Sequence, residues 1–575
     1  MRVQYPRTPH LPWSPGATAD DVRTGDLSGL AGAEVVVTEK LDGENTTLYR
    51  EGLHARSLDS AHHPSRAWVK ELHGRIGRLI PPGWRVSGEN MYARHSIPYD
   101  DLESWFYGFS VWNERDACLD WDTTVRFLRR AGLPTPRVLW RGRYDERALR
   151  SLASSLDLDR QEGYVLRTVQ GFPRAEFGER IAKWVRPRHV RTDTHWMHAA
   201  VVPNGLGPSA ALWAVRCGAR PAPGALATAL GLDELPGPEH ELAEISDRLD
   251  ALGRTGDRRL TGVLATVLRA TRREELAPRL VGTLGLPLAR RVADLVGLHP
   301  RLHRPHPDED RYAGLVRMSE AADLEVLHAL AALTAPGPEE EQQVAWSELH
   351  ADAGALLDPD PLDGLRKGLR ESLADLGREA ADRCYAQARE AYALGRLERT
   401  DEAVAATWRW RDGEFPRLIQ LTGPAGSGKS TFTGTLGAVD TVVSLDGLRT
   451  ARGSRADQRD NADVLREGLD RLSAALVPGA TVVWDATSLN RHQRSLVQGV
   501  AQRRDALVTQ AVMIVDEAEL QRRNATRPHP VPAQVLTAQL HRYQPPYPGE
   551  AHRTWYVGAR GTVEDRAGSL DLEED

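Results

Sequence analysis

One short segment constrains the fold more than any other part of the sequence. Residues 423–430 read Gly-Pro-Ala-Gly-Ser-Gly-Lys-Ser and directly follow the apolar run 418–421. A glycine-rich loop of this spacing, between a strand and a helix, lets backbone N–H groups close around a phosphate. Further apolar runs at 441–445, 481–484 and 507–515 alternate with helical stretches. The pattern therefore predicts βαβ units and a mainly parallel sheet in a domain spanning 414–560.

The remainder of the chain follows other patterns. Its 575 residues predict three or four domains. Residues 1–205 contain Trp, Tyr and short β-type runs such as 34–38, which indicates a mixed α/β domain. A Pro- and Gly-rich stretch at 201–227 separates it from Leu- and Ala-rich sequence with helical spacing. We expect a helical domain over 228–335, a helical linker over 340–410, and thus a multidomain α/β protein with an all-α middle.

Composition excludes several classes of protein. The net charge of −6 argues against a generally basic nucleic-acid binder, so we expect at most a local basic patch. The three cysteines are too far apart for a disulfide framework, and no apolar run is long enough for a membrane span or a signal peptide. We expect a cytoplasmic protein. The best candidates for the basic patch are Arg180, Lys183, Arg186, Arg188 and Arg191, although a solvated charged face explains such a run equally well.

Lysine is rare in this chain. Of 74 Lys and Arg residues, only Lys40, Lys70, Lys183, Lys367 and Lys429 are lysines. A lysine amine, unlike a guanidinium, becomes a nucleophile once it is deprotonated. The few lysines therefore mark positions where this chemistry is worth testing, and three of them fall within the motifs described here.

The glycine-rich loop suggests a nucleotide site. Lys429 is expected to neutralise the β- and γ-phosphates, and Ser430 to hold Mg²⁺. The other loop residues expected to contact the nucleotide are Gly423, Gly426, Gly428 and Thr431.

Polar residues follow the later strands of this domain in order. Asp446 is placed to accept a proton from an attacking hydroxyl, and Arg449 to grip a nearby phosphate. Asp485 and Asn490 follow the next strand, and Arg523 and Arg527 share a helical face that suits a lid over the phosphates. Taken singly, Asp446 is equally well explained as a helix cap and the arginines as a solvated face.

In this order the residues resemble the 5′-hydroxyl polynucleotide kinase family over about 414–550. The resemblance implies that Asp446 is the general base, that Arg449 contacts the phosphate flanking the acceptor nucleotide, and that Arg523 and Arg527 are lid residues. It also suggests Asp485 and Asn490 as substrate-binding residues. Kinases of small metabolites share much of this pattern, so the substrate stays open on this half alone.

Near the N-terminus, Lys40-Leu-Asp42-Gly43-Glu follows the apolar run 35–37. A lysine at a strand end, with its pKa lowered by burial and nearby cations, is able to attack an α-phosphate, and Gly43 permits a tight turn beside the nucleotide. A surface turn containing Asp-Gly is the alternative explanation. The segment resembles the K-x-D-G motif of ATP-dependent ligases and capping enzymes, in which Asp42 and Gly43 belong to the nucleotide site.

The downstream sequence repeats the order of that superfamily over about 1–200. The matching residues are Arg56, Glu89, Phe109, Glu162, Lys183 and Arg186. The resemblance implies that Phe109 stacks on the nucleobase, that Glu162 helps to place the catalytic metal, and that Lys183 contacts the α-phosphate. The last motif often has a second lysine; here Arg186 and Arg188 stand nearby, which leaves that phosphate contact in doubt.

Three features favour RNA over DNA. The opening Tyr5-Pro-Arg-Thr-Pro-His10 and the segment 188–196 resemble a bacterial and phage RNA ligase group. The lysine comes early in the chain, and the coupled kinase resembles enzymes of RNA 5′-end healing. The implied activity is phosphorylation of RNA 5′-OH ends and their joining to 3′-OH ends, with ATP and Mg²⁺ or Mn²⁺ as cofactors and a separate 3′-end-healing enzyme as a partner. The alternatives are a DNA-joining enzyme and a nucleic-acid-binding stress sensor with vestigial catalytic domains.

The middle of the chain is less specific. Residues 228–335 loosely resemble the second half of an HD-type phosphohydrolase, but Val267-Leu268-Arg269 stands where the His-Asp metal ligands are needed. His299, His303 and His306 cluster in the sequence without an evident carboxylate partner. We expect a degenerate, metal-free helical module; a plain helical linker and an active phosphohydrolase are the alternatives.

Overall fold

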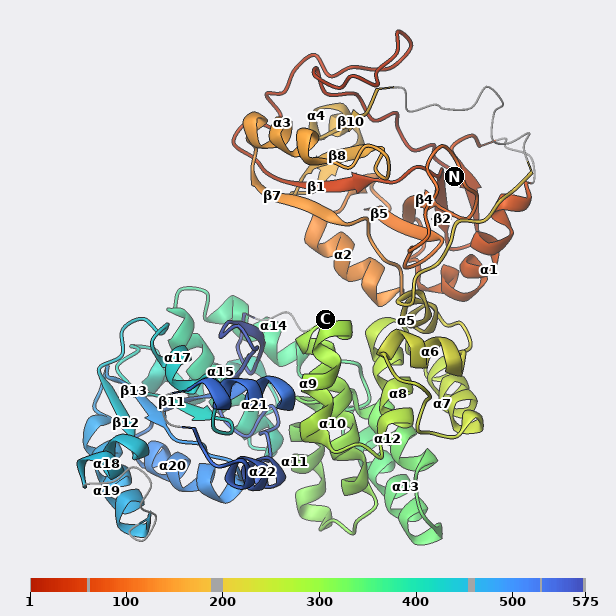
Figure 1. Cartoon of the computed structure of the whole chain (residues 1–575). Coiled ribbons are helices and arrows are strands. Elements are labelled where there is room, and N and C mark those ends of the chain that lie inside the picture. The colour runs from red at the N-terminus through yellow and green to blue at the C-terminus, as the bar shows by residue number, and fades with distance from the viewer. Residues whose placement is uncertain (1, 59–62, 188–199, 453–460, 528–529, 572–575) are drawn as a thin grey trace. The chain divides into compact units, whose positions relative to one another are not determined.

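The computed structural model describes residues 2–58, 63–187, 200–452, 461–527 and 530–571. The chain divides into two compact units, residues 1–263 and 264–574 (Figure 1). The division falls within a single helix, α8 (Gly256–Leu268). The domain bounds expected from the sequence are finer than this division and stay predictions. Among the described residues, no helix combines the length and the apolar character needed to cross a bilayer.

The first unit is built on two antiparallel sheets. One has the strand order β10-β8-β1-β7, and the other has the order β3-β2-β4-β5-β6-β9. The first sheet comprises β1 (Glu34–Lys40), β7 (Val138–Arg143), β8 (Gly163–Thr168) and β10 (Ile181–Val185). The second comprises β2 (Glu44–Tyr49), β3 (Gly52–Ala55), β4 (Arg85–Asn90), β5 (Phe106–Trp112), β6 (Ala117–Cys118) and β9 (Phe172–Pro173).

The link between β1 and β2 places the K-x-D-G motif. The valines of β1 are buried on both faces of the strand, which explains the continuous apolar run in the sequence. The chain leaves the first sheet at Lys40 and enters the second at Glu44. In the first sheet Lys40 pairs with Gly163 of β8, and in the second Asn45 pairs with Glu89 of β4. Residues from both sheets are therefore brought close to Lys40.

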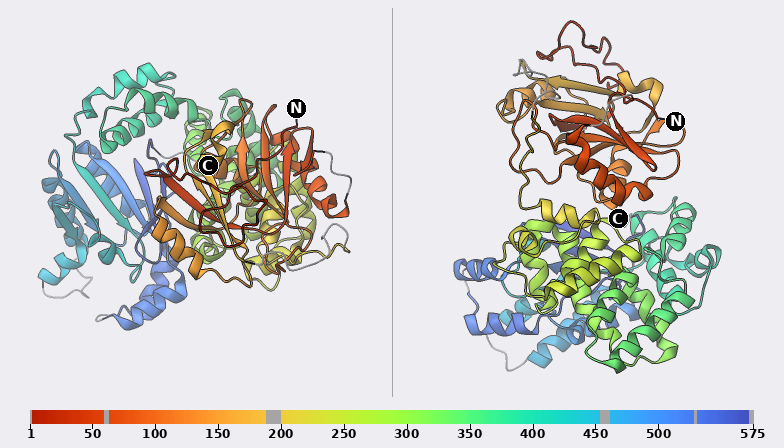
Figure 2. Two further views of the ribbon diagram at one scale, coloured as in Figure 1. Left: turned by 90° about the horizontal axis from the view of Figure 1, so that it is seen from above. Right: turned by 90° about the vertical axis from the view of Figure 1, so that its right-hand side faces the viewer.

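Helices cover the sheets of this unit. α1 (Ala67–Ile76) and α2 (Trp121–Arg130) pack on the second sheet through a shared apolar cluster that includes Leu72, Phe106 and Leu128 (Figures 1 and 2). The remaining helices are α3 (Glu146–Ser155), α4 (Phe177–Arg180), α5 (Ala210–Arg216), α6 (Pro223–Leu230) and α7 (Glu239–Ala251). Asp257 at the start of α8 pairs with Arg129 of α2 at 2.5 Å and with Arg216 of α5 at 2.7 Å. Helices that follow the predicted boundary thus pack with the N-terminal sheets.

The second unit combines the predicted helical middle from residue 264 onward with an α/β domain. Its first part is all-helical, as expected. The helices are α9 (Arg273–Leu284), α10 (Leu286–Leu302), α11 (Asp308–Ser319), α12 (Leu324–Leu333), α13 (Pro338–Ala353), α14 (Asp363–Ser372), α15 (Arg378–Ala393) and α16 (Thr400–Ala406). α14, α15 and α16 share an apolar cluster with Leu507 of the α/β domain.

The α/β domain has the predicted, mainly parallel sheet, in the order β12-β13-β11-β14-β15-β16. Its strands are β11 (Arg417–Thr422), β12 (Thr441–Ser444), β13 (Thr481–Asp485), β14 (Leu507–Met513), β15 (Arg553–Val557) and β16 (Val563–Ala567). Among the described strands of this sheet, only β16 runs antiparallel to its neighbour. The helices are α17 (Lys429–Thr433), α18 (Leu445–Ala451), α19 (Asn461–Ala475), α20 (Arg491–Arg503), α21 (Glu517–Thr526) and α22 (Ala533–Arg542).

The strand order explains where this domain carries its site. After β11 the chain crosses to β12 and β13 on one side, and β14 lies on the other side. Ligands of open α/β sheets bind at such a reversal, beyond the carboxyl ends of the strands. The glycine-rich loop leaves β11 at this point.

Candidate active sites

A pocket in the first unit collects residues from both sheets. Five of the residues that the sequence singled out line it: Lys40, Arg56, Glu89, Phe109 and Lys183. Four others, Asp42, Gly43, Glu162 and Arg186, are not among the lining residues. Other residues that line the pocket had no role predicted from the sequence, among them Tyr5, Asn45, Trp121 and Arg167.

Lys40 and Glu162 form the central ion pair of this site. The Nζ atom of Lys40 donates to the carboxylate of the buried Glu162. Their contact follows from the strand register, because Lys40 pairs with Gly163, the residue after Glu162. Burial lowers the pKa of Lys40, but the charges of Glu162 and Glu89 outweigh burial and hold this pKa above its ordinary value. The lowered pKa predicted from the sequence is therefore wrong, because the pattern does not show which carboxylates surround the amine.

Two further ionisable groups of the pocket are strongly shifted. Burial raises the pKa of Glu89 to about 7, against the lowering effect of Lys40. Burial together with the charge of Lys40 lowers the pKa of Lys183 to about 8. Shifts of this kind are typical of sites that hold charged ligands or move protons.

Asp42 and Gly43 shape the connection between the two sheets. The Asp42 carboxylate accepts hydrogen bonds from the backbone N–H groups of Ser96 and Ile97 at 2.8 and 3.0 Å. A Cβ atom on Gly43 would lie 2.6 Å from the carbonyl oxygen of Asn90 and 3.0 Å from Cγ of Glu89. Gly43 is therefore required by the close approach of β4, which carries Glu89 into the pocket.

The ring of Phe109 packs against an aromatic residue of the N-terminal segment. The ring of Tyr5 meets the ring of Phe109 edge-on, with 5.4 Å between centroids. Backbone hydrogen bonds from Lys183 to Pro9 and from Leu11 to Lys183 hold the segment beside β10 and so bring Tyr5 to the pocket. Arg167 donates to the carbonyl oxygen of Phe109 at 3.3 Å. Tyr5 belongs to the opening segment 5–10 and Arg167 follows Glu162 in β8, but neither position indicated a functional role from the sequence alone.

The expected basic patch is not one exposed surface in the described residues. Arg186 is buried and donates to the carbonyl oxygen of Leu158, and Lys183 lines the pocket. Arg180 pairs with Glu176. Arg188, Arg191 and the rest of the segment 188–196 lie outside the described residues.

The second unit presents the glycine-rich loop in a conformation that needs glycine. Gly426 and Gly428 have φ values of +82° and +95°, which side chains rarely tolerate. The Nζ atom of Lys429 donates to the carbonyl oxygens of Gly423 and Pro424 at 2.9 and 2.8 Å. Burial lowers the pKa of Lys429 to about 8, although the charges of Asp485 and Asp446 act in the opposite direction. Ser430 and Thr431 follow in α17.

Asp446 and Arg449 face each other on α18. Nη1 of Arg449 donates to Oδ1 of Asp446 at 2.8 Å. The cap of this helix is Ser444, whose Oγ accepts from the N–H of Gly447 at 3.3 Å. The explanation of Asp446 as the cap of this helix is therefore unnecessary, and its carboxylate acts electrostatically on Lys429.

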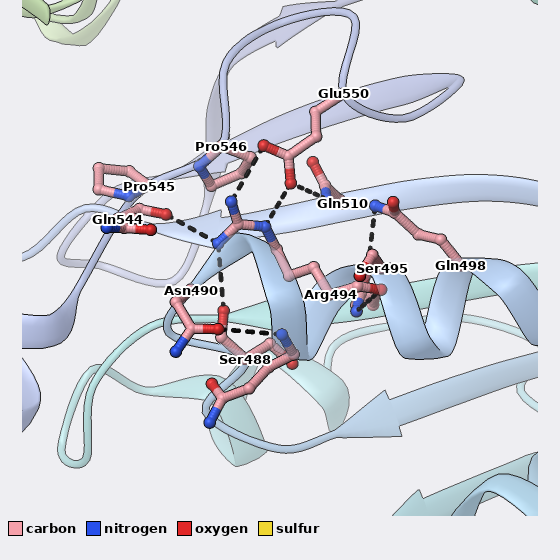
Figure 3. A network of polar contacts seen from close by, with 12 residues as sticks. Ser488, Asn490, Arg494, Ser495, Gln498, Gln510, Gln544, Pro545, Pro546 and Glu550 are labelled. Carbon is pink, nitrogen blue, oxygen red and sulfur yellow. Dashed lines mark hydrogen bonds and ion pairs between the residues drawn. The ribbon is translucent and has the colours of Figure 1, made fainter.

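Asp485 is the last residue of β13, and Asn490 is the N-cap of α20. Oδ1 of Asn490 caps that helix by accepting from the N–H of Gln493 at 3.0 Å. Between them, the 486–490 loop is supported by the buried Arg494, which donates to the carbonyl oxygens of Ser488 and Gln544 (Figure 3). Glu550 accepts from the same guanidinium at 3.0 Å. The loop thus rests on a network that no sequence motif indicated.

The two lid candidates lie at the end of α21. Arg523 pairs with Glu519 at 2.6 Å and comes within 3.6 Å of the position of a Cβ on Gly428. The charge of Arg527 lowers the pKa of Lys429, which places that arginine within electrostatic range of the loop. Gln539 of α22, which the sequence argument missed, accepts from the N–H of Ala425 within the loop at 2.8 Å.

Two of the three clustered histidines of the helical middle, His299 and His303, bond to backbone carbonyl oxygens. His303 contacts the carbonyl oxygen of Ala331 at 2.8 Å, and His299 that of Leu295 at 3.3 Å. Burial lowers the pKa of His299 to about 4. Over the described parts of the chain, no group of three or more His, Cys, Asp or Glu side chains is arranged to hold a metal ion.

Comparisons with known proteins assign two segments. The RNA ligase family model matches residues 33–185, and the model of an AAA domain matches residues 418–546. The chain therefore carries an RNA ligase domain near its N-terminus and a P-loop domain of kinase type near its C-terminus. No curated protein matches the sequence. The resemblance of the middle to HD-type phosphohydrolases stays a prediction.

Solved structures overlap with parts of the chain. A gluconokinase from Sinorhizobium meliloti 1021 is 23% identical over 25% of this chain and 84% of its own, with a TM-score of 0.20. An archaeal ATP-dependent RNA ligase is 16% identical over 32% of this chain, with a TM-score of 0.23. A Naegleria gruberi RNA ligase is 19% identical over 29% of this chain, with a TM-score of 0.22. The chain spans 48% and 55% of the lengths of these two ligases.

Proposed function

We propose that this protein heals and seals broken RNA: its P-loop domain phosphorylates 5′-OH ends, and its ligase domain joins the resulting 5′-phosphates to 3′-OH ends. One observation carries the proposal. Lys40, Glu89, Phe109 and Lys183 come from four different strands of two sheets, yet they line one pocket in the segment that matches RNA ligases. A surface turn at Lys40 would not bring these side chains together.

In the ligase half, Lys40 is the nucleophile. Its neutral amine attacks the α-phosphorus of ATP, the N–P bond forms, and the bond to pyrophosphate breaks with the electron pair leaving on pyrophosphate. AMP then passes to the RNA 5′-phosphate, and a 3′-OH displaces AMP to seal the strand. Lys183 supplies positive charge beside the phosphates, and Phe109 offers a ring face to the base. Arg56, which lines the pocket, is proposed to assist phosphate binding; the buried Arg186 does not line the pocket.

In the kinase half, Lys429 and the loop N–H groups bind the donor phosphates. Asp446 accepts the proton of the attacking 5′-hydroxyl, and Arg449, Asp485 and Asn490 position the acceptor. Arg523 and Arg527 stabilise the charge on the transferred phosphoryl group. The O–P bond to the acceptor forms as the bond to the donor diphosphate breaks.

The residues at both sites fit a divalent cation that arrives with the nucleotide. Mg²⁺ is commonly held by one or two protein oxygens together with substrate phosphates and water, so a three-residue protein site is not required. Glu162 beside Lys40 and Ser430 at the start of α17 are the proposed ligands. Bound there, Mg²⁺ or Mn²⁺ would neutralise phosphate charge and, near Glu162, offset the negative charge that keeps Lys40 protonated.

The deciding experiment offers the full chain a nicked stem-loop RNA with 5′-OH and 3′-OH ends, ATP, and Mg²⁺ or Mn²⁺. The expected result is a sealed strand, with a 5′-phosphorylated intermediate at early times. A matched 5′-phosphate RNA should be sealed without a lag, and matched DNA strands should be poorer substrates. Efficient joining of DNA alone would support the DNA-joining alternative. Absence of both phosphorylation and the lysine adduct would support a sensor with vestigial domains.

The 3′ end supplies a further test. The proposed chemistry needs a 3′-OH, so RNA with a 2′,3′-cyclic phosphate should remain open until a 3′-end-healing enzyme is added. Sealing of such RNA by the chain alone would contradict this part of the proposal.

A further inference from the structure

The helical middle contacts the α/β domain through the first residues of α9. Arg273 pairs with the buried Asp294 of α10 at 2.6 Å and donates to the carbonyl oxygens of Pro545 and Pro546, the latter at 3.1 Å. Its guanidinium lies 3.5 Å from the ring centroid of Tyr547. The preceding Arg272 contacts the ring and the carbonyl oxygen of His541, at the end of α22. Two adjacent arginines therefore hold the connection that follows α22.

The same connection holds the 486–490 loop. The backbone N–H of Gln544 donates to the carbonyl oxygen of Leu489 at 2.8 Å. Arg494 lies between the two segments and donates to Gln544 on one side and to Ser488 on the other (Figure 3). Arg273 is thus linked to the loop by direct contacts. It bonds to Pro545, and the residue before Pro545, Gln544, bonds to Leu489.

The loop needs such support. Ser488 has a φ of +46°, a left-handed conformation that costs a non-glycine residue roughly 1 kcal/mol. Residues in strained conformations persist only where their surroundings fix them. The neighbouring Thr487 accepts from the N–H of Gly423 at 2.9 Å, so the strained loop also contacts the start of the glycine-rich loop. Asp485 directly precedes this loop, and Asn490 is its last residue.

Gly297 of α10 lies at the place where Arg273 and Tyr547 pack against this helix. A Cβ atom on Gly297 would lie 2.3 Å from the hydroxyl of Tyr547 and 2.4 Å from Cδ of Arg273. Glycine inside a helix is unfavourable by about 1 kcal/mol relative to alanine, so its presence here is consistent with a need for this close contact. The absence of a side chain at Gly297 leaves the space in which Arg273 and Tyr547 contact each other against α10.

We infer that Arg273 is a positioning residue of the P-loop domain, through which α9 and α10 fix the 486–490 loop and hence Asp485 and Asn490. The catalytic consequence rests on the proposed kinase function, whereas the mechanical link does not. The helical middle accordingly supports the phosphoryl-acceptor site and is more than a tether between two domains. Residues of α9 and α10 are not proposed to touch the acceptor; they act through the 541–547 connection.

The test uses two alanine substitutions of helical glycines in the full chain. The added methyl group of Gly297→Ala occupies the space beside α10 and displaces Tyr547 and Arg273. The substitution removes no polar group, and alanine has the higher helix propensity. Gly282→Ala in α9 is the matched control, because nothing lies within 4 Å of its Cβ position. Arg273→Lys is the third variant: it keeps a charge opposite Asp294 but lacks the planar fork that reaches two carbonyl oxygens.

Two readouts separate the inference from the proposed function. Amide hydrogen exchange of peptides covering 485–490 should be several-fold faster in Gly297→Ala and Arg273→Lys than in the wild type, and unchanged in Gly282→Ala. The KM for a 5′-OH oligoribonucleotide should rise about tenfold in the first two variants, with a smaller change in the KM for ATP. Sealing of 5′-phosphate RNA by the ligase domain is the internal control for an intact chain.

Each outcome decides the matter. Unchanged loop exchange in Gly297→Ala and Arg273→Lys would overturn the inference, as would faster exchange with unaltered kinase constants. A uniform fall in kcat together with a lower Tm would indicate a merely structural contact and also overturn it. If the wild type phosphorylates no polynucleotide, the proposed function fails, while the exchange data still decide whether α9 holds the loop.

Discussion

The carboxylate of Glu162 contacts the Nζ atom of Lys40, and this ion pair keeps the proposed nucleophile protonated in the nucleotide-free pocket. The amine must lose its proton before it attacks phosphorus. The contact that orients Lys40 therefore also disfavours the neutral amine that the attack requires. The pH dependence of lysine adenylylation should report this pair directly.

The first prediction concerns Glu162→Gln. Removing the carboxylate charge removes a cause of the raised Lys40 pKa, so the pKa falls and the amine becomes neutral at lower pH. The pH midpoint of adduct formation with radiolabelled ATP should move down by about one unit. The midpoint, and not the amplitude, is the measurement, because Glu162 is also a proposed metal ligand. Glu39→Gln is the control, since Glu39 pairs with Arg137; an unmoved midpoint in Glu162→Gln would contradict the assignment.

The second prediction concerns the nucleophile itself. Lys40→Ala should abolish the radiolabelled AMP adduct, because no other amine is proposed to attack the α-phosphate. Phosphorylation of 5′-OH RNA should persist at the wild-type rate. Lys70→Ala, at an exposed position of α1, is the matched lysine control and should form the adduct normally. A full-level adduct in Lys40→Ala would refute the role of Lys40.

The third prediction tests why Gly43 is a glycine. An added Cβ would press on the carbonyl of Asn90 and on Glu89, so Gly43→Ala should shift β4 and cost about 1–3 kcal/mol of stability. Adenylylation should fall further than stability, because Glu89 belongs to the pocket. Gly74→Ala in α1 meets no atom within 4 Å and is the control. Equal activity of the two variants in adduct assays would show that the close approach is relaxed.

The sequence predicted the elements whose pattern is local. The parallel sheet follows from apolar runs that alternate with helices, and the glycine-rich loop follows from residues adjacent in the chain. The strands β15 and β16 were missed, and β16 contains no apolar run of the kind that marked the predicted strands. Short segments of this kind gain their strand character from the sheet they join.

Contacts between residues that lie far apart in the chain could not be predicted from the sequence. The pKa of Lys40 depends on Glu162 and Glu89, which reach it through the pairing of separate strands, and the sequence pattern does not state that register. Likewise, the contact of Arg273 with the 545–547 segment joins residues more than 270 positions apart. Motif order indicates which residues belong to a site, whereas charge balance and support networks require the fold.

The fourth prediction separates the two proposed activities from the kinase side. Lys429→Ala removes the charge that faces the donor phosphates, so phosphorylation of 5′-OH RNA should fall by at least about 100-fold. Sealing of 5′-phosphate RNA should be unaffected. Lys367→Ala, whose exposed ammonium pairs with Asp363, is the control and should behave as the wild type. Continued phosphorylation by Lys429→Ala would show that the loop is not the donor site.

The last prediction follows from the pKa of Lys429. Burial lowers this pKa to about 8, so in the nucleotide-free protein the side chain loses its charge as the pH rises above that value. Because kcat/KM reports the free enzyme, kcat/KM for ATP in the kinase reaction should decline above about pH 8, whereas kcat should hold to higher pH once phosphates stabilise the ammonium. Lys429→Arg keeps a charge throughout this range, so any residual activity of that variant should lack the decline. A decline of the same shape in Lys429→Arg would assign the titration to another group, and a flat wild-type profile up to pH 10 would show that Lys429 remains charged in the free protein.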